Sequence, residues 1–321
     1  MKKFCYLAVL VLAFAAAFLM SGCGEKGPEK LKVGVSIPAA THGWAGGVVY
    51  HAEQCRAELM KANPDLEIFV TTGSTTAEQN DRVENLLARK LDALVVLCQE
   101  PAQIAQVCKL AKQQGVYLAV VSNPLPEPVQ DVFLNGDNRG FGRAAAEAMG
   151  KLLNGKGDIV IMEGIPCPIN SERVGGFMEV LKAKYPGIRV LASQSANWNT
   201  EKGLALMENY LQKFSKIDGV WAGDDDVLTG ALKAVEESGR KDIQVMVGGG
   251  GAKTMVKRVM DRDPLVKATV TYPPAMIRTA METAVKALRN NRQTPQKEII
   301  VPSEIVLPEN ASKHYYPDSV Y

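Results

Sequence analysis

From Lys32 onward, short apolar runs rich in β-branched residues alternate with longer segments whose apolar residues recur at helical spacing. Several short runs, such as ALVVLC and DIVIM, are almost continuously apolar, which is typical of parallel strands covered on both faces. Ten strands are predicted, at Lys32–Pro38, Leu66–Thr72, Ala93–Cys98, Tyr117–Ser122, Val132–Leu134, Asp158–Glu163, Arg189–Gln194, Gly219–Ala222, Gln244–Gly248 and Val266–Tyr272. The helical segments between them are Gln79–Lys90, Ala102–Gln114, Gly140–Leu153, Glu172–Tyr185, Glu201–Phe214, Val227–Ser238 and Ala275–Asn290.

This alternation of strands and helices indicates an α/β fold. Repeated strand–helix units form doubly wound parallel sheets with right-handed crossovers. Ten strands within roughly 290 residues fit two such sheets better than one. The sequence therefore predicts two Rossmann-like lobes, each built around its own parallel sheet.

The first 22 residues are typical of an export signal. Lys2 and Lys3 precede an unbroken apolar run over residues 4–20, and small residues follow. The sequence MSGC at 20–23 resembles a bacterial lipobox, in which the cysteine becomes the lipid-bearing first residue. We therefore predict a signal peptide at 1–22, then a lipidated Cys23 and a polar tether at 23–30, which place the protein on the exported side of a bacterial membrane. The alternative is an uncleaved membrane anchor, which would leave the same domain outside the cytosol.

The charge balance excludes several classes of partner. The chain carries 37 Lys+Arg and 35 Asp+Glu, a net charge of +2. Residues 1–22 contain two lysines and no acid, so their removal leaves 35 basic and 35 acidic side chains. A neutral body lacks the basic field that nucleic acid or an acidic membrane surface requires. Contact with a membrane is therefore expected only through the lipid on Cys23.

The cysteines do not indicate a zinc or thiol-redox centre. Cys5 leaves with the signal peptide and Cys23 takes the lipid. The four that remain have no CxxC spacing and allow three disulfide pairings, between which the sequence does not choose. Free thiols buried as small apolar groups fit the pattern as well as a disulfide does. These four cysteines are Cys55, Cys98, Cys108 and Cys167.

Polar and aromatic residues gather just beyond the predicted strands. In open α/β sheets, ligands bind outside the carboxyl ends of strands, so these residues are candidate ligand contacts. Trp44 and Trp198 stand in polar contexts, THGWAGG and SANWNT, which favours a pocket over the core. The candidate ligand-binding residues are Ser36, His42, Trp44, Gln99, Asn123, Asp137, Arg173, Trp198, Asp224 and Tyr272.

Catalytic alternatives find little support. The run GGGGAKT at 248–254 is close to a phosphate loop, but Ala252 stands where that loop needs a glycine before Lys-Thr. A backbone nest for a phosphorylated or anionic ligand remains open there. The three histidines form no metal-ligand cluster, and no Gly-x-Ser-x-Gly elbow is present. We therefore predict binding without chemistry, and no metal or cofactor.

Several motifs together resemble the type I periplasmic sugar-binding proteins, over essentially residues 31–321. The resemblance lies in KVGVSIP, LNGDNRGFGRAAAEAM, SERVGGFMEVL, WAGDDDVLTGALKAVEESG, VMVGGGG and ATVTYPPAMI, in this order. It implies a secreted clamshell receptor, which we expect to be monomeric and to feed the permease of an ABC importer. It also implies an N-terminal lobe (31–136 with 273–295) and a C-terminal lobe (137–272 with 296–321), joined by three crossovers.

The resemblance also places five of the candidate residues in the cleft between the lobes. Arg173, expected to open a helix, can hold two hydroxyls or a carboxylate with its fork of donors; its alternative role is an interdomain ion pair. One of Asp225 and Asp226 is expected to cap the helix that follows. Tyr272 precedes two prolines and is either hinge structure or a ligand contact. The five residues are Trp44, Arg173, Trp198, Asp224 and Tyr272.

The chain departs from the ribose-binding type at three places. Ser122-Asn123 stands where that type has Asp-Arg, and Gly250 where it has Asp. His42 lies near a position that often holds Asn. A site built on specific hydrogen bonds rejects ligands that leave its groups unpaired, so another sugar, a polyol or another small polar metabolite fits better than ribose. The alternative function is a sensory receptor that presents its closed form to a chemoreceptor or sensor kinase, and the sequence does not separate the two.

Overall fold

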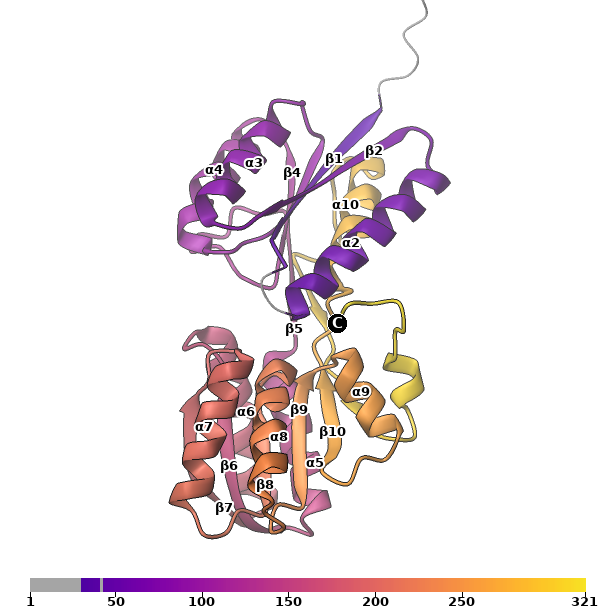
Figure 1. The fold of residues 1–321 in the computed structure, drawn as a ribbon. Coiled ribbons are helices and arrows are strands. Elements are labelled where there is room, and N and C mark those ends of the chain that lie inside the picture. The colour runs from indigo at the N-terminus through magenta and orange to yellow at the C-terminus, as the bar shows by residue number, and fades with distance from the viewer. Residues whose placement is uncertain (1–29, 41–42) are drawn as a thin grey trace, which may run out of the picture.

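The computed structural model describes residues 30–40 and 43–321, which form two lobes stacked one above the other in Figure 1. The predicted signal peptide, the lipid-bearing Cys23, the tether up to residue 29 and His42 lie outside the described residues. The expectations for them therefore stay predictions.

The N-terminal lobe is built on a sheet of six parallel strands in the order β11-β5-β4-β3-β1-β2. Side chains along β3 are buried alternately in two hydrophobic clusters, one on each face of the sheet. Helices α2 and α10 cover one face, and α3 and α4 cover the other. The elements are β1 (Leu31–Pro38), α2 (Gly43–Ala62), β2 (Leu66–Gly73), α3 (Thr76–Leu87), β3 (Ala93–Leu97), α4 (Pro101–Gln113), β4 (Tyr117–Val121), β5 (Val132–Gly136), α10 (Met276–Arg289) and β11 (Glu298–Val301).

The C-terminal lobe repeats this plan, with strands in the order β12-β10-β9-β8-β6-β7. All its pairings are parallel except that of β12, which runs antiparallel to β10. Helices α5 and α6 cover one face, and α7, α8 and α9 the other. The elements are α5 (Asn138–Leu152), β6 (Lys156–Glu163), α6 (Pro168–Lys184), β7 (Gly187–Ser195), α7 (Thr200–Lys213), β8 (Gly219–Ala222), α8 (Asp225–Ser238), β9 (Val245–Gly250), α9 (Lys253–Met260), β10 (Val266–Thr271), β12 (Ile305–Val306) and a 3₁₀ turn (Ala311–His314).

The predicted α/β fold with two doubly wound lobes is confirmed, and all ten predicted strands are present. The predicted ranges leave out α2, α9 and the two short strands β11 and β12. Helix α6 begins at Pro168, four residues earlier than expected, because proline suits the first turn, where its missing N–H costs nothing. Arg173 therefore lies in the second turn of α6 and does not open the helix.

Three crossovers join the lobes. The chain passes from β5 to α5 at Asp137, from β10 to α10 through Pro273 and Pro274, and from β11 to β12 over residues 302–304. Strand β11 pairs with β5 in the N-terminal sheet, whereas the expected boundary assigned everything after residue 295 to the C-terminal lobe. The reason is that β11 completes the edge of the first sheet before the chain crosses for the third time.

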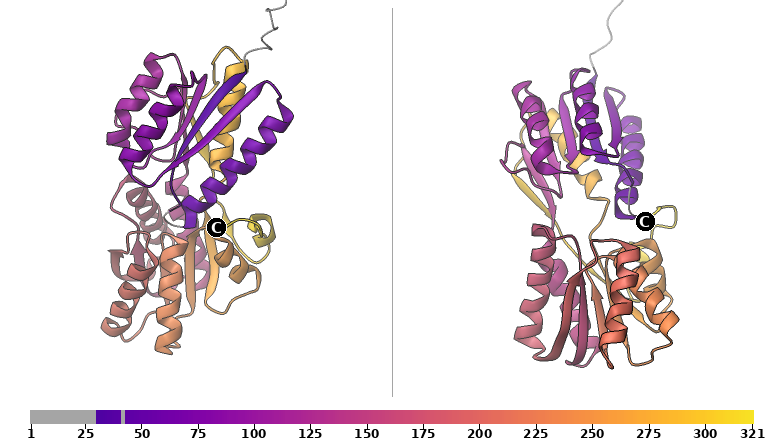
Figure 2. Two further views of the ribbon diagram at one scale, coloured as in Figure 1. Left: turned by 45° about the horizontal axis from the view of Figure 1, so that its top comes forward. Right: turned by 60° about the vertical axis from the view of Figure 1, so that its left-hand side comes forward.

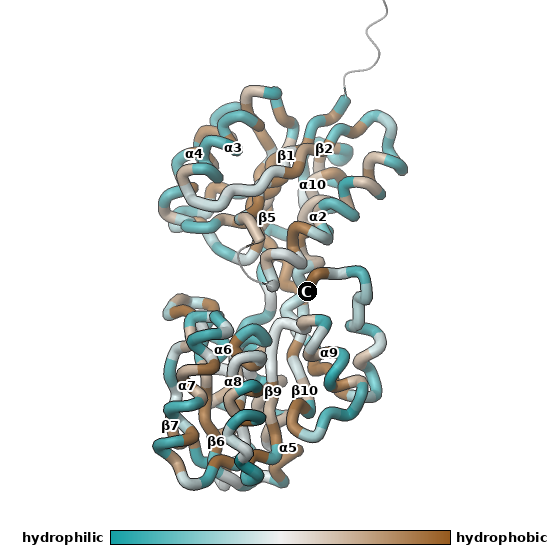
Figure 3. The backbone as a smooth tube through the Cα atoms, viewed as in Figure 1, coloured by the Kyte–Doolittle hydropathy of each residue, from teal (hydrophilic) through white to brown (hydrophobic). Residues whose placement is uncertain are grey.

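The core follows the strands through both lobes, as the hydropathy colouring in Figure 3 shows. One cluster is continuous from α2 and α10 through the hinge to α5 and α6. Between α6 and β8 of the C-terminal lobe, the rings of Phe177 and Trp221 stack with centroids 3.9 Å apart and planes 2° apart. This shared cluster gives the hinge region a packed, apolar foundation.

Helices α5 and α6 approach each other unusually closely. A Cβ added to Gly142 would overlap the carbonyl oxygen of Arg173, and one added to Gly176 would overlap that of Arg139. A Cβ at the neighbouring Gly175 would meet nothing within 4 Å. The two buried glycines therefore set the distance at which α6 packs on α5.

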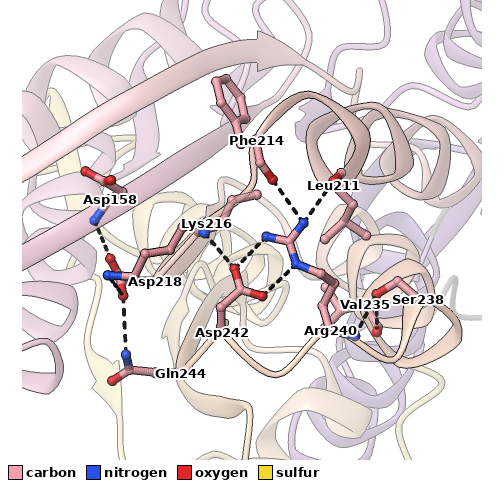
Figure 4. Close-up of polar contacts among 11 residues, drawn as sticks. Asp158, Leu211, Phe214, Lys216, Asp218, Val235, Ser238, Arg240, Asp242 and Gln244 are labelled. Atoms are coloured by element: carbon pink, nitrogen blue, oxygen red, sulfur yellow. Dashed lines mark hydrogen bonds and ion pairs between the residues drawn. The ribbon is translucent and has the colours of Figure 1, made fainter.

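A polar network closes the C-terminal lobe at the end away from the cleft (Figure 4). Arg240 donates to both carboxylate oxygens of Asp242 and to the carbonyls of Leu211 and Phe214, which end α7. These hydrogen bonds lower the pKa of Asp242 to about 2. Asp218 accepts from the amide of Asp158 in the same region. The network provides hydrogen-bond partners for the carbonyls at the end of α7 and for the amide of Asp158. Its role is therefore structural.

The four remaining cysteines are free thiols in the structure, three of them buried and Cys167 half-buried. Of the two readings that the sequence left open, these thiols match the free, buried one. Within 30–40 and 43–321, no helix has both the length and the apolar character needed to cross a bilayer.

Candidate functional site

The carboxyl ends of the two sheets face each other across a cavity of about 110 Å³. Side chains from both lobes line it, and the crossover that follows β10 begins beside it at Tyr272. The lining residues are Trp44, Ser122, Asn123, Ile169, Arg173, Trp198, Asp224, Gly250 and Tyr272. Six of the ten predicted ligand-binding residues are thus brought together: Trp44, Asn123, Arg173, Trp198, Asp224 and Tyr272.

Arg173 is the central cation of this cavity. Its side chain is sandwiched between aromatic rings, with Cζ 4.1 Å from the centroid of Phe141 and 4.5 Å from that of Tyr272. Nε donates to Asn138 Oδ1 (3.1 Å), and one terminal nitrogen donates to the carbonyl of Gly223 (2.8 Å). Only 5% of the residue is exposed, and burial lowers its pKa. The expected alternative, an interdomain ion pair, is not formed with any residue that the structure describes.

Asp224 lies at the edge of the cavity and is also the N-cap of α8. Its Oδ1 accepts from the amides of Asp226 (2.8 Å) and Val227 (3.4 Å). The expectation that Asp225 or Asp226 caps this helix is therefore wrong, since the chain turns into the helix one residue earlier. Burial, and then the neighbouring carboxyls, raise the pKa of Asp224 to about 7, which the charge on Arg173 partly opposes.

Asp225 fills the glycine-rich turn after β9. Its carboxylate accepts from the amides of Gly249 (2.8 Å), Gly251 (2.9 Å) and Ala252 (2.8 Å), and from the hydroxyl of Thr269 (2.9 Å). Burial raises its pKa to about 6, and these hydrogen bonds act in the opposite direction. The nest that the sequence left open for an anionic ligand is thus occupied by a carboxylate of the chain itself.

Trp44 and Tyr272 form one wall where α2 meets the hinge. The indole Nε1 of Trp44 donates to the carbonyl of Tyr272 (2.8 Å), and the two ring centroids are 5.7 Å apart. The Tyr272 hydroxyl lies 3.0 Å from Ser122 Oγ. Tyr272 therefore combines the two roles left open for it, since it belongs to the hinge and lines the cavity.

Two lining residues have strained backbones. Ser122 has φ +62° and Trp198 has φ +52°, in the left-handed region that non-glycine residues rarely adopt. Such strain costs on the order of 1–3 kcal/mol and is found mainly at functional sites. The Nε1 of Trp198 is buried beside Gly164 with no hydrogen-bond partner among the described residues. An unsatisfied donor at a cavity wall is a group that a polar ligand would satisfy.

Three predicted site residues do not line the cavity. Ser36 is buried beneath Gln79, whose Nε2 lies 3.3 Å from the serine Oγ. The backbone amide of Gln99 donates to Oε1 of the same glutamine (2.9 Å). Asp137 caps α5 at the first crossover by accepting from the amide of Gly140 (2.7 Å). Gln99 and Asp137 follow strands as predicted and Ser36 lies within β1, but all three make their contacts within the fold.

The sequence prediction missed Ser122, Ile169 and Gly250 as lining residues. Ile169 is apolar and lies in the unpredicted first turn of α6, so no polar signal marked it. Gly250 contributes only backbone. Ser122 is the last residue of a predicted strand and directly precedes Asn123. Its position alone therefore indicated a residue near the ligand site.

We expect the unliganded protein to lose stability as the pH rises from about 4 to about 7. Asp224 holds its proton to higher pH in the folded state than in the unfolded chain, so the folded state binds more protons in this window. Asp224→Asn keeps the N-cap but cannot ionise, and should reduce the slope of melting temperature against pH, while Asp225, whose pKa is raised to about 6, retains the rest of the slope. Asp81→Asn, at an exposed position on α3, is the matched control. A wild-type profile that the Asp224 variant leaves unaltered contradicts the prediction.

Comparison with known proteins gives a consistent result. A family model described as "Periplasmic binding protein domain" matches residues 33–292. The ribose import binding protein of Bacillus subtilis (strain 168) is 27% identical over 319 residues, covering 95% of this chain and 99% of that protein. The xylitol-binding protein of Mycolicibacterium smegmatis is 32% identical over 206 residues, 63% of this chain and 58% of the relative.

Solved structures share the fold. A periplasmic solute-binding protein of an ABC transporter from Actinobacillus succinogenes, with bound D-allose, superposes with a TM-score of 0.78 at 24% identity, covering 88% of this chain and all of the other. A solute-binding protein from Bacillus halodurans with bound myo-inositol gives a TM-score of 0.76 at 22% identity, covering 92% of this chain and all of the other. At these identities the likeness concerns the fold alone.

Proposed function

Because the chain belongs to the periplasmic binding protein family, we propose that it is an exported solute-binding protein that holds a sugar, a polyol or a similar small polar molecule between its lobes. The observation that carries the proposal is the cavity itself, in which two tryptophans, a buried arginine and an aspartate converge from both lobes. Such a set suits a polyhydroxylated ring, whose apolar face packs on indole and whose hydroxyls bond to fixed polar groups.

The charges in the cavity favour an uncharged ligand. Arg173 is one buried cation, and Asp224 is an acid whose raised pKa leaves it free to exchange a proton near neutrality. A phosphorylated ligand would need further donors, but the amides of the turn after β9 are already donated to Asp225. We therefore propose neutral polyols and sugars, rather than sugar phosphates, as the ligand class.

Binding proceeds by closure of the lobes, without chemistry. A ligand that contacts both lobes binds the closed arrangement more tightly than the open one and so shifts the population toward it. The three crossovers are the segments that absorb this motion. The closed form then docks on the permease of an ABC importer through the rims of both lobes.

The proposal is tested by thermal shift with D-allose, D-ribose, xylitol, myo-inositol, glycerol, ribose 5-phosphate and adenosine. At 100 times its dissociation constant, a ligand raises the unfolding free energy by about 2.7 kcal/mol, a shift of several degrees. We expect at least one neutral sugar or polyol to do so and the phosphate to fail. A response to the phosphate alone contradicts the proposed ligand class, and turnover of a ligand contradicts binding without chemistry.

Lipid anchoring at Cys23 completes the proposal. With this anchor the protein stays at the membrane surface beside its permease, although its body carries balanced charge. Full-length protein expressed in a bacterial host should incorporate labelled fatty acid, and Cys23→Ser should abolish that incorporation. A wild type that partitions into a detergent phase but takes up no fatty acid identifies the alternative, the uncleaved apolar segment.

Sensing is the second candidate function. One neighbour in structure is the fructose-binding periplasmic domain of a hybrid two-component system, with a TM-score of 0.74 at 22% identity. A two-lobed receptor of this fold is therefore compatible with signalling as well as import. Crosslinking of the liganded protein in membranes of its own cells separates the two: a permease supports import, and a chemoreceptor or kinase supports sensing.

A further inference from the structure

The last residue of the chain lies between the lobes. The terminus marked C in Figures 1 and 2 sits at the level of the hinge, beside the start of α2. Tyr321 is 6% exposed and belongs to the hydrophobic cluster of the C-terminal lobe. The tail from residue 307 thus runs past α9 and returns to the region of the ligand cavity.

Two glycines of α2 make room for the tyrosine ring. A Cβ at Gly43 would lie 2.7 Å from Tyr321 Cδ2, and a Cβ at Gly47 would lie 3.1 Å from Tyr321 Cβ. Larger side chains at either position would push the ring away. The N-terminal lobe therefore carries a slot that fits this residue of the tail.

The hydroxyl of Tyr321 lies beside Gly250, at the end of β9 in the C-terminal lobe. A Cβ at Gly250 would overlap Tyr321 Oη, and the glycine has φ +120°, which side chains rarely adopt. Gly250 lines the ligand cavity and also a second cavity of about 230 Å³ on the hinge side, which Tyr321 lines. Tyr321 lines only the second cavity, and its hydroxyl occupies the space of a side chain at position 250, a residue that both cavities share.

This hydroxyl is unsatisfied. Tyr321 Oη is buried and has no hydrogen-bond partner among the residues that the structure describes. Burial, and then the charges of Asp224, Asp225 and Asp226, raise the pKa of Tyr321 well above its ordinary value, so the group stays a protonated donor. A buried donor without a partner is costly, which favours any state in which it finds one.

We propose that Tyr321 is a ligand-recognition residue, whose hydroxyl donates a hydrogen bond to an oxygen of the bound sugar or polyol beside Gly250. The inference rests on the proposed function and adds to it a specificity-determining group supplied by the tail. The proposed donor would reach a ligand in the cavity of about 110 Å³ past Gly250, where β9 contributes only backbone to the lining. Ligands with a hydroxyl at that position are selected over those without one.

The test is Tyr321→Phe, which keeps the ring in its slot and removes only the hydroxyl. Tyr316→Phe is the matched control, because it removes a hydroxyl from an exposed residue of the same tail. Binding of the best sugar or polyol from the panel above is measured by calorimetry, together with its monodeoxy analogues. We expect Tyr321→Phe to weaken binding about tenfold, or about 1.4 kcal/mol, and Tyr316→Phe to change it less than twofold.

The melting temperature and the affinity for a deoxy analogue distinguish a role of Tyr321 in ligand recognition from a role in stabilising the fold. Without ligand, Tyr321→Phe should melt no lower than the wild type, because the lost hydroxyl had no partner; a lower melting temperature overturns the inference. For the deoxy analogue that lacks the contacted hydroxyl, the two proteins should bind equally. Unchanged affinity for every ligand overturns the role of Tyr321 alone, whereas a wild type that binds no sugar or polyol overturns the proposed function as well.

Discussion

Replacing Arg173 with alanine is expected to abolish the ligand-dependent thermal shift and to weaken binding at least about 100-fold, or about 2.7 kcal/mol. The guanidinium is the only buried cation of the described cavity and offers several donors in a fixed fork. Sugar hydroxyls bound by such a fork lose more than one hydrogen bond when it is removed. Thermal shift and calorimetry with the best ligand of the panel measure the effect.

The same substitution should also lower the stability of the unliganded protein. Asn138 Oδ1 and the carbonyl of Gly223 lose their donor, and each unsatisfied buried acceptor costs about 1–3 kcal/mol. Arg173→Lys keeps the charge but not the fork, so it should restore part of the stability and little of the affinity. Arg143→Ala, which removes an exposed ion pair with Glu179, is the control and should cost less than about 1 kcal/mol.

Full affinity in a folded Arg173→Ala protein would remove this residue from the site. Affinity restored by lysine would show that charge alone matters and that the fork does not. Both measurements need the folded fraction, which circular dichroism supplies at the temperature of the binding experiment.

Gly176→Ala should lower the free energy of unfolding by about 3 kcal/mol, since overpacking of a close contact forces the backbone to move. The added methyl would overlap the carbonyl of Arg139 on α5. Gly175→Ala, one residue earlier on the same helix, meets nothing within 4 Å and should raise stability by up to about 1 kcal/mol through helix propensity. Denaturant unfolding of the two variants beside the wild type measures both changes.

The two neighbouring glycines are predicted to respond in opposite directions, so one comparison tests the close packing of α6 on α5. If both alanines stabilise the protein, the close approach of α5 and α6 is not required. Because α6 also carries Arg173, a displaced helix should weaken ligand binding in Gly176→Ala even where the protein is still folded. Gly175→Ala should leave binding unchanged.

The strands were predictable because their apolar runs are nearly continuous. A strand such as β3, buried on both faces, can be built only from such a run. Strands β11 and β12 were not predictable, since they are short and pair at sheet edges that only the assembled lobe creates. Helix α9 was predictable, because Met255, Val256 and Val259 recur at helical spacing after the glycine run.

The cavity was predictable where it is lined by large polar or aromatic side chains at strand ends, as with Asp224 and Trp198. It was not predictable where a side chain from another element bonds to the polar residues at a strand end. Ser36 and Gln99 form hydrogen bonds with Gln79 of α3. Nothing in the sequence around Ser36 or Gln99 indicates these bonds. The same limit applies to Asp225, whose partners arrive from a turn 24 to 27 residues later.

Two hydrogen bonds join the start of α2 to the C-terminal lobe and to the hinge. The amide of Gly43 at the start of α2 donates to Asp226 Oδ2 of α8 (3.2 Å), and Trp44 donates to the hinge carbonyl of Tyr272. Each such bond contributes about 0.5–1.5 kcal/mol to the arrangement in which it forms. Apparent affinity scales with the fraction of molecules already in the binding-competent arrangement. Changing Asp226, a residue outside the cavity lining, should therefore shift the apparent affinity for a ligand without changing which ligand is preferred.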